Sequence, residues 1–238
     1  MKNILIPTTL QHDTLFAVKT ALKQANSNCN ITIMYVRDVA DAESASLFLR
    51  SARPSKTDLQ AKILEACHSE ANNYPHCTLE LHNRYGISAP LLKNLLQHLN
   101  TDFIIVPASY RQERDSIHHY CLNLLSNSKI SMLHLTEAGE ELEFNKALYL
   151  EHSSAQLDIQ QLQELVGNRF NLRIVSHASL AENYPEQLEQ QLNDAIAKNN
   201  IDLLIETRKT EKIRMKKRKE AYVNETLGLP VLSIFEEV

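Results

Sequence analysis

The chain has 238 residues, 43% of them hydrophobic and 23% charged, which is typical of a globular protein with a sizeable core. The formal net charge of -4 argues against nucleic-acid binding driven by overall charge. No apolar segment approaches the ~18 residues of a membrane helix, and the N-terminus lacks the apolar stretch of a signal peptide. We therefore expect a cytoplasmic protein with no membrane partner.

Short apolar runs alternate with helix-period segments along the first half of the chain. Residues 3–7 (NILIP) predict a buried strand, and residues 13–26 predict an amphipathic helix with Asp13 as its N-cap. The remaining strands are predicted at 30–36, 77–83, 102–106 and 130–135, and the remaining helices at 57–72, 88–99 and 116–126. This alternation predicts a parallel sheet with helices on both faces, because right-handed helical crossovers join parallel neighbours.

The pattern restarts after residues 136–145, an acidic stretch that contains Gly139 and predicts a linker. Strands are then predicted at 146–151, 171–176, 201–205 and 230–235, and helices at 157–170, 185–199 and 211–227. The second half has one helix-strand pair fewer than the first. We interpret the chain as an α/β protein with two doubly wound parallel-sheet domains in tandem, residues 1–137 and a trimmed second copy, residues 144–238.

Four segments carry a resemblance to a known family: KNILIPT followed by a helix, NITIMYV, DFIIVPAS and the closing LGLPVLSIF. In this order and spacing they are similar to segments of the universal stress proteins, and the chain resembles the tandem form. The resemblance implies a five-stranded sheet of order 3-2-1-4-5 and a non-enzymatic role in the stress response, in regulation or as a scaffold for an unknown protein partner. Single domains of the family pair through their last strands. The resemblance therefore implies that ISMLHL and PVLSIF lie at the contact between the two halves, and it leaves a homodimer open.

The family's nucleotide motif finds no match in this chain. ATP-binding members carry G-x2-G-x9-G-[S/T] after the fourth strand, where this chain has Pro107 and Tyr110 for the first two glycines, and Glu206 and Lys209 in the second copy. A phosphate cradle needs converging backbone N–H groups, whereas Pro107 has none and Tyr110 is bulky. We predict a degenerate nucleotide site without a cofactor. The alternative is a sensor that binds ATP or AMP through a non-standard loop of the first domain.

Any ligand of an open α/β sheet is expected beyond the carboxyl ends of the strands, where the strand order reverses. In the first domain the candidate lining residues are Pro7, Thr8, Thr9, Val36, Pro107 and Ser109. Their hydroxyls and a helix N-terminus could hold a small anion or a nucleoside. The alternative is that Thr8, Thr9 and Ser109 only cap turns and helices. In the second domain Glu151 and Glu206 would repel a phosphate.

No other motif predicts chemistry. The chain contains no GxSxG or HExxH, so we expect no enzyme.

Two groups of histidine and cysteine invite a metal interpretation: His118, His119 and Cys121, and Cys67, His68, His76 and Cys77. Neither has the paired spacing of structural zinc, so we predict no metal and interpret the four cysteines, which form no CxxC pair, as small buried apolar residues. The basic run 208–220 is interpreted as a solvated helix face, with an anionic ligand, RNA or an acidic partner as the alternative.

Overall fold

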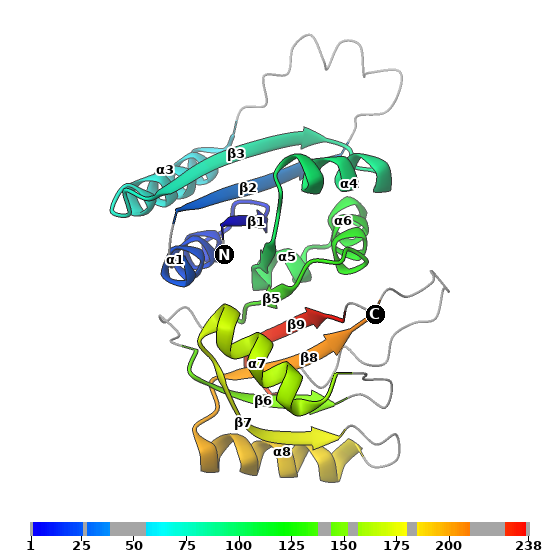
Figure 1. Ribbon diagram of the computed structural model, residues 1–238. Helices are drawn as coiled ribbons and strands as arrows, with labels where there is room; N and C mark the ends of the chain where they lie inside the picture. The colour runs from blue at the N-terminus through cyan, green and yellow to red at the C-terminus, as the bar shows by residue number, and fades with distance from the viewer. Residues whose placement is uncertain are drawn as a thin grey trace. The chain divides into compact units, whose positions relative to one another are not determined.

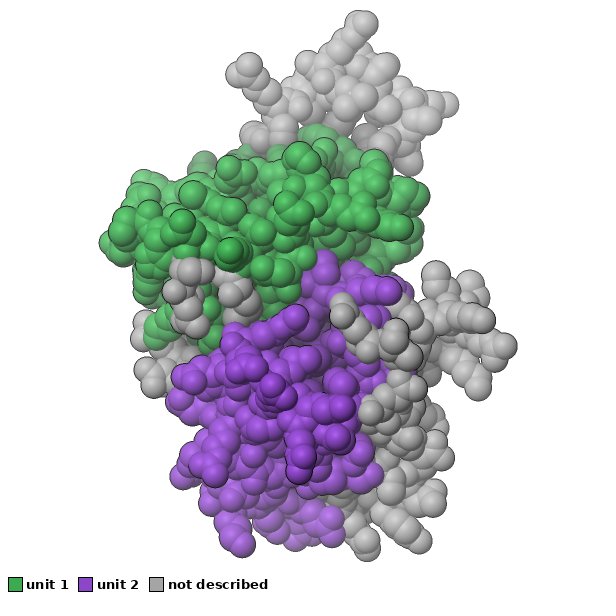
Figure 2. Space-filling model, in the orientation of Figure 1, with its two compact units in different colours: residues 1–126 green, residues 127–238 purple. Residues whose placement is uncertain are grey.

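The computed structural model describes residues 2–25, 28–38, 56–137, 144–151, 157–179, 185–209 and 227–236. The chain divides into two compact units, Met1–Ser126 and Asn127–Val238, which Figure 2 colours separately. No helix among the described residues combines the length and the apolar character needed to cross a bilayer.

The first unit contains a parallel sheet of order β3-β2-β1-β4. Its strands are β1 (Asn3–Pro7), β2 (Cys29–Arg37), β3 (Cys77–Tyr85) and β4 (Phe103–Val106). Its helices are α1 (Asp13–Gln24), α3 (Asp58–Ala71), α4 (Ala89–His98), α5 (Ala108–Gln112) and α6 (Ser116–Ser126). Helix α1 packs beside α3, and α6 packs beside α4, so that helices cover both faces of the sheet (Figure 1).

The second unit has five strands in the order β7-β6-β8-β9-β5. They are β5 (Met132–His134), β6 (Lys146–Glu151), β7 (Arg173–Ser179), β8 (Leu203–Arg208) and β9 (Val231–Phe235), accompanied by α7 (Ile159–Phe170) and α8 (Pro185–Asn199). Strands β6 to β9 are parallel, and β5 is antiparallel to β9.

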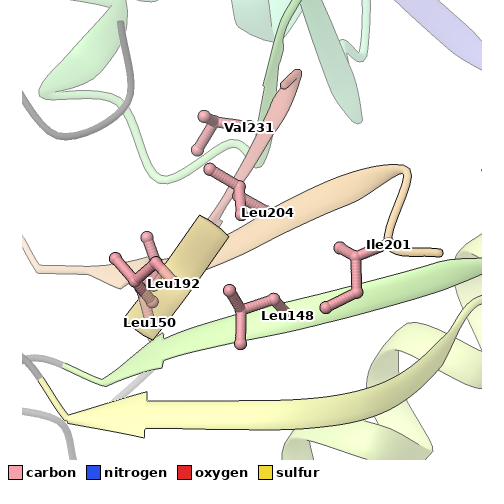
Figure 3. Close-up of a cluster of buried hydrophobic side chains, with 6 residues drawn as sticks. All are labelled: Leu148, Leu150, Leu192, Ile201, Leu204 and Val231. Atoms are coloured by element: carbon pink, nitrogen blue, oxygen red, sulfur yellow. The ribbon is translucent and has the colours of Figure 1, made fainter. Parts of the chain in front are cut away.

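The core of the second unit includes a cluster of aliphatic side chains. Figure 3 shows Leu192 of α8 beside Leu150 of β6, and the cluster also includes Ile201 from the segment leading into β8. The strands contribute Leu148, Leu150, Leu204 and Val231 to this cluster. The central strands are therefore apolar, as expected of parallel strands that are covered by helices.

The fold class predicted from the sequence is confirmed: the chain is a mixed α/β protein whose strands are mostly parallel. The second half has one helix-strand pair fewer, as predicted, because β7 is followed by α8 and then directly by β8, whereas α3, β3 and α4 lie between β2 and β4. The domain bounds 1–137 and 144–238 and the pairing of the two halves stay predictions. The strand predicted at 130–135 groups with the second unit, because β5 pairs with β9.

Two local expectations were wrong. Asp13 is the first residue of α1 rather than its N-cap, which is His12, because the Asp13 carboxylate binds residues of another segment. The short helix α5 was not predicted, since five residues are too few to show a helical period. The predicted helix 211–227 lies almost entirely outside the described residues.

Candidate functional site

The turn after β1 is built around the hydroxyl of Thr8, which is fully buried. Its Oγ1 accepts a hydrogen bond from the backbone N–H of Leu10 at 2.8 Å and lies 2.7 Å from the hydroxyl oxygen of Thr14. These contacts hold Leu10 at φ 60°, a left-handed conformation that a leucine rarely adopts. Thr8 thus fixes a tight turn.

The turn after β4 is closed by a carboxylate from α1. Asp13 Oδ2 accepts the backbone N–H of Ser109 at 2.8 Å, and Asp13 Oδ1 accepts the Ser109 hydroxyl at 2.6 Å. The first N–H groups of a helix have no intrahelical partner, and this one is satisfied from within the chain. The residue before α5, Pro107, has no N–H to offer.

Tyr110 and His118 form a buried aromatic pair behind this turn. Tyr110 is 1% exposed and His118 is 5% exposed, and their rings meet edge to face with centroids 5.3 Å apart. Burial raises the pKa of the Tyr110 phenol and lowers the pKa of His118 below 6.5. The His118 imidazole is therefore neutral at pH 7, and the pair adds no charge to the turn.

A cavity of about 430 Å³ opens at the carboxyl ends of β1 and β2. Its lining residues come from the turn after β1, the end of β2, the start of α3 and the segment before α6: Thr9, Leu10, Gln11, His12, Tyr35, Thr57, Leu59, Gln60, Glu113, Asp115 and His118. Gln60 Nε2 joins two of these lining residues, because it donates to the Thr9 carbonyl at 3.2 Å and to the Tyr35 hydroxyl at 3.0 Å. The cavity wall is thus tied together by one amide side chain.

One side of the cavity lining is acidic. Glu113 and Asp115 contribute carboxylates, and Glu113 Oε2 accepts from Gln11 Nε2 at 3.3 Å. Beside the cavity, the Arg37 guanidinium stacks on the Tyr35 ring at 4.8 Å from its centroid. An anionic ligand in this cavity would therefore lie near two carboxylates.

The six residues proposed from the sequence lie at the carboxyl ends of β1, β2 and β4, but the structure does not bring them into one cavity. Thr9 lines the cavity. Pro7, Thr8, Val36 and Pro107 are buried, and Ser109 is held by Asp13; none of these five lines the cavity. Whether any of the six binds a ligand stays a prediction.

The corresponding edge of the second unit holds two contacts between an acidic and a basic side chain. Glu151 Oε2 lies 2.6 Å from His177 Nε2, and the His177 ring stacks on Tyr149 with centroids 5.8 Å apart. The Glu236 carboxylate is 2% exposed and lies 3.5 Å from the Lys209 ammonium nitrogen. Each of these two carboxylates thus has a basic side chain beside it on this edge.

Metal ligands do not gather in the part of the chain that is described. It contains no group of three or more His, Cys, Asp or Glu side chains placed to hold an ion. Of the sequence groupings, His118 and Cys121 are buried on α6, whereas His119 on the same helix is exposed. Of the basic run 208–220, only Arg208 and Lys209 are described.

The sequence reasoning missed the residues that shape the cavity. Tyr35 and Gln60 line the cavity but are not among the residues predicted for the site, and neither is Asp13, which holds Ser109 outside the cavity. A signal for Gln60 was present, because Thr57 and Gln60 have the spacing of a capping box, which the structure shows in full. Nothing local in the sequence marks the Asp13 contact with Ser109, since 96 positions separate the two residues.

No family model and no curated protein matches the chain. Solved structures do. A universal stress protein from Archaeoglobus fulgidus is 11% identical, with all of both chains covered and a TM-score of 0.58. A putative universal stress protein from Pseudomonas aeruginosa is 10% identical, with 99% of this chain and 93% of that chain covered and a TM-score of 0.57. A functionally unknown protein of the same species is also 10% identical, with 99% and 92% coverage and a TM-score of 0.57. The chain has the fold of the universal stress proteins along its whole length.

Proposed function

We propose that the chain is a cytoplasmic protein of the universal stress type that acts without catalysis, as a regulator or scaffold in a stress response. We further propose that its first unit does not hold a nucleoside triphosphate. One observation carries the second point: the Asp13 carboxylate occupies the backbone N–H and the hydroxyl of Ser109.

The physical argument concerns the donors that a phosphate would need. A phosphate group after β4 would be bound by backbone N–H groups that converge on it. Here Pro107 provides none, and the Ser109 N–H already donates to a carboxylate at 2.8 Å. A phosphate would have to displace Asp13 while lying beside it, and two like charges repel each other strongly near a protein surface.

The buried pair behind the turn works in the same direction. Tyr110 is 1% exposed and packs against His118, so the turn has no room to rearrange around an anion without opening the core. The carboxylates of Glu113 and Asp115 on the cavity side add further repulsion. This combination supports a degenerate triphosphate site.

Thermal unfolding in the presence of nucleotides tests the proposal. A ligand that binds only the native state adds about 2.7 kcal/mol at a hundred times its dissociation constant, which is easily measured. We expect no shift of the melting temperature of the wild-type protein with millimolar ATP. A dose-dependent shift that persists in the presence of magnesium would contradict the proposal.

Asp13→Asn sharpens this test. The variant removes the charge while keeping an acceptor for Ser109, so any weak affinity for phosphate should rise. The matched control is Asp58→Asn, because Asp58 is also the first residue of a helix but the N-cap of that helix is Thr57. Equal ATP responses of the two variants would show that Asp13 does not block the site.

The second candidate function is an AMP or ATP sensor that uses a non-standard site. The cavity beside Tyr35 and Gln60 favours it, because its volume lies within the range of about 300–1,000 Å³ that is usual for small-molecule sites. Its lining exposes more apolar than polar surface and carries two carboxylates, which suits an uncharged nucleoside group better than a phosphate. Adenosine or AMP binding that is lost in Tyr35→Ala but kept in Arg114→Ala, an exposed site outside the lining, would support this alternative.

A further inference from the structure

Two cysteines that are 48 positions apart in the sequence (77 − 29) are direct neighbours in the sheet of the first unit. Cys29 is the first residue of β2, Cys77 is the first residue of β3, and the two are register partners. Register partners on parallel strands project their side chains from the same face of the sheet. Neighbouring strands are about 4.8 Å apart, which lies within the range of roughly 4.4–6.8 Å between Cα atoms joined by a disulfide.

The two thiols also interact with each other. The Cys29 thiol hydrogen-bonds to the sulfur of Cys77, and this contact favours the protonated form of Cys29 and the thiolate of Cys77. Cys29 is 1% exposed, whereas Cys77 is half-buried. Cys77 is therefore the more exposed of the two cysteines and also the one whose thiolate is stabilised by its neighbour, Cys29.

We propose that Cys29 and Cys77 form a reversible disulfide when hydrogen peroxide oxidises the protein. The Cys77 sulfur attacks one peroxide oxygen, the O–O bond breaks, and Cys77 becomes a sulfenic acid as one water leaves. The Cys29 sulfur then attacks the Cys77 sulfur, the S–O bond breaks, and a second water leaves. Two thiols are oxidised by two electrons in total, and one peroxide is reduced to two waters.

Sheet geometry makes this bond reversible. The Cβ atoms of register partners are about as far apart as the strands, ~4.8 Å, which exceeds the mean of ~3.8 Å across a disulfide. Closure must draw the starts of β2 and β3 together, and a strained bond is more easily reduced. Among the described strands of the first unit, β3 pairs only with β2, so its start can shift with little loss elsewhere.

The reaction is slow at neutral pH. Burial raises the pKa of Cys29 to about 12 and also raises that of Cys77, against the opposing effect of the Cys29 hydrogen bond. Little thiolate is therefore present, and oxidation needs sustained exposure. Cys67 and Cys121 are fully buried and lie on the helices α3 and α6 rather than on paired strands, so they are natural internal controls.

The crosslink would act on the first unit without touching the cavity. It lies at the amino ends of the strands, while the cavity lies at their carboxyl ends. The closed segment between Cys29 and Cys77 contains Tyr35, Thr57 and Gln60 of the cavity wall. Closing a long loop restricts the unfolded chain and should stabilise the fold. This proposal does not depend on nucleotide binding.

The experiment treats the full-length protein with hydrogen peroxide, alkylates the remaining free thiols and identifies crosslinked peptides by mass spectrometry. We expect one major product, in which the Cys29 and Cys77 peptides are joined with the loss of two hydrogen atoms. Dithiothreitol should reverse it, and the oxidised protein should melt several degrees higher than the reduced one. The reaction should also be faster at higher pH, since more thiolate is present.

Variants separate this bond from other oxidation. Cys77→Ser should remove both the crosslink and the rise in melting temperature, and Cys121→Ala should keep both. A Cys77 sulfinic acid beside an unmodified Cys29, or a Cys77 crosslink between two chains, would overturn the proposal. The peptide map of the wild-type protein decides the question even if a variant does not fold.

Discussion

The two units are alike at the amino ends of their strands and differ at the carboxyl ends. In the first unit, the Asp102 carboxylate accepts the backbone N–H groups of Lys2 at 3.0 Å and Asn3 at 3.3 Å. In the second unit, the Asp202 carboxylate accepts those of Asn145 at 2.9 Å and Lys146 at 3.1 Å. Each carboxylate joins the starts of two adjacent parallel strands.

The residues just before each aspartate are also alike. Asn100 and Asn200 both adopt a left-handed conformation, with φ of 46° and 52°, where α4 and α8 end. The next residue in each copy donates its N–H back to the helix, Thr101 to Leu96 and Ile201 to Ile196. The same helix-to-strand turn is thus built twice.

The carboxyl ends use different chemistry in the two units. The first unit has a hydroxyl pair and the Asp13 carboxylate on Ser109, whereas the second has the pairs Glu151–His177 and Lys209–Glu236. The turns that align the sheet are therefore shared, while the edge where ligands bind in open α/β sheets has diverged. A ligand found in one unit would say little about the other.

The largest effect is expected for Asp13→Ala, which breaks the turn that is special to the first unit. The Ser109 N–H and hydroxyl would both lose a charged acceptor, which should lower the free energy of unfolding by about 2 kcal/mol. Urea denaturation measures the loss. Asp58→Ala serves as the control for the helix dipole, and an equal loss in both variants would mean that the Ser109 contact contributes nothing.

A smaller effect is expected at the shared turns. Asp102→Asn and Asp202→Asn each keep one oxygen but lose the second acceptor, so each should cost about 1 kcal/mol. The same denaturation experiment compares the two. If the two losses of unfolding free energy differ several-fold, the two turns contribute unequally to stability despite their similar geometry.

The smallest effect on stability is expected from His118, which lies on α6 of the first unit. Burial lowers its pKa in the folded protein below the ordinary 6.5. The unfolded chain therefore takes up the proton first, and the stability that His118 contributes is present above pH 6.5 and is lost as the pH falls below it. The difference between the denaturation midpoints measured above and below pH 6.5 should be smaller in His118→Gln than in the wild type. The exposed His119→Gln should behave like the wild type.

The sequence predicted most of the fold because its signals are local. The apolar run Asn3–Pro7 and the helix Ser116–Ser126 coincide with the structure, and the missing helix-strand pair of the second copy was visible from the spacing of the elements. The parallel sheet followed from the alternation of strands and helices, whereas the strand order came from the family resemblance alone. Strand ends were less accurate, as at β8, which runs to Arg208.

The site was less predictable because its contacts join distant positions. Topology placed Thr8, Val36 and Ser109 at the carboxyl ends of the strands, but it gave no sign that Asp13 holds Ser109 or that Gln60 bonds Tyr35 in the cavity wall. The cysteine pair was missed for the same reason. Spacing along the chain suggested isolated thiols, whereas the register of β2 and β3 places Cys29 opposite Cys77.

The position of β9 between β5 and β8 also bears on biosynthesis. Met132 pairs with Ser233, and Ile205 pairs with Leu232, so both neighbours of β9 leave the ribosome before it exists. The first unit has all four strands once Val106 has emerged, whereas the second cannot close its sheet until translation reaches Phe235. During that interval the nascent chain carries strand edges that can capture other polypeptides, so this half should depend more on chaperones than the first.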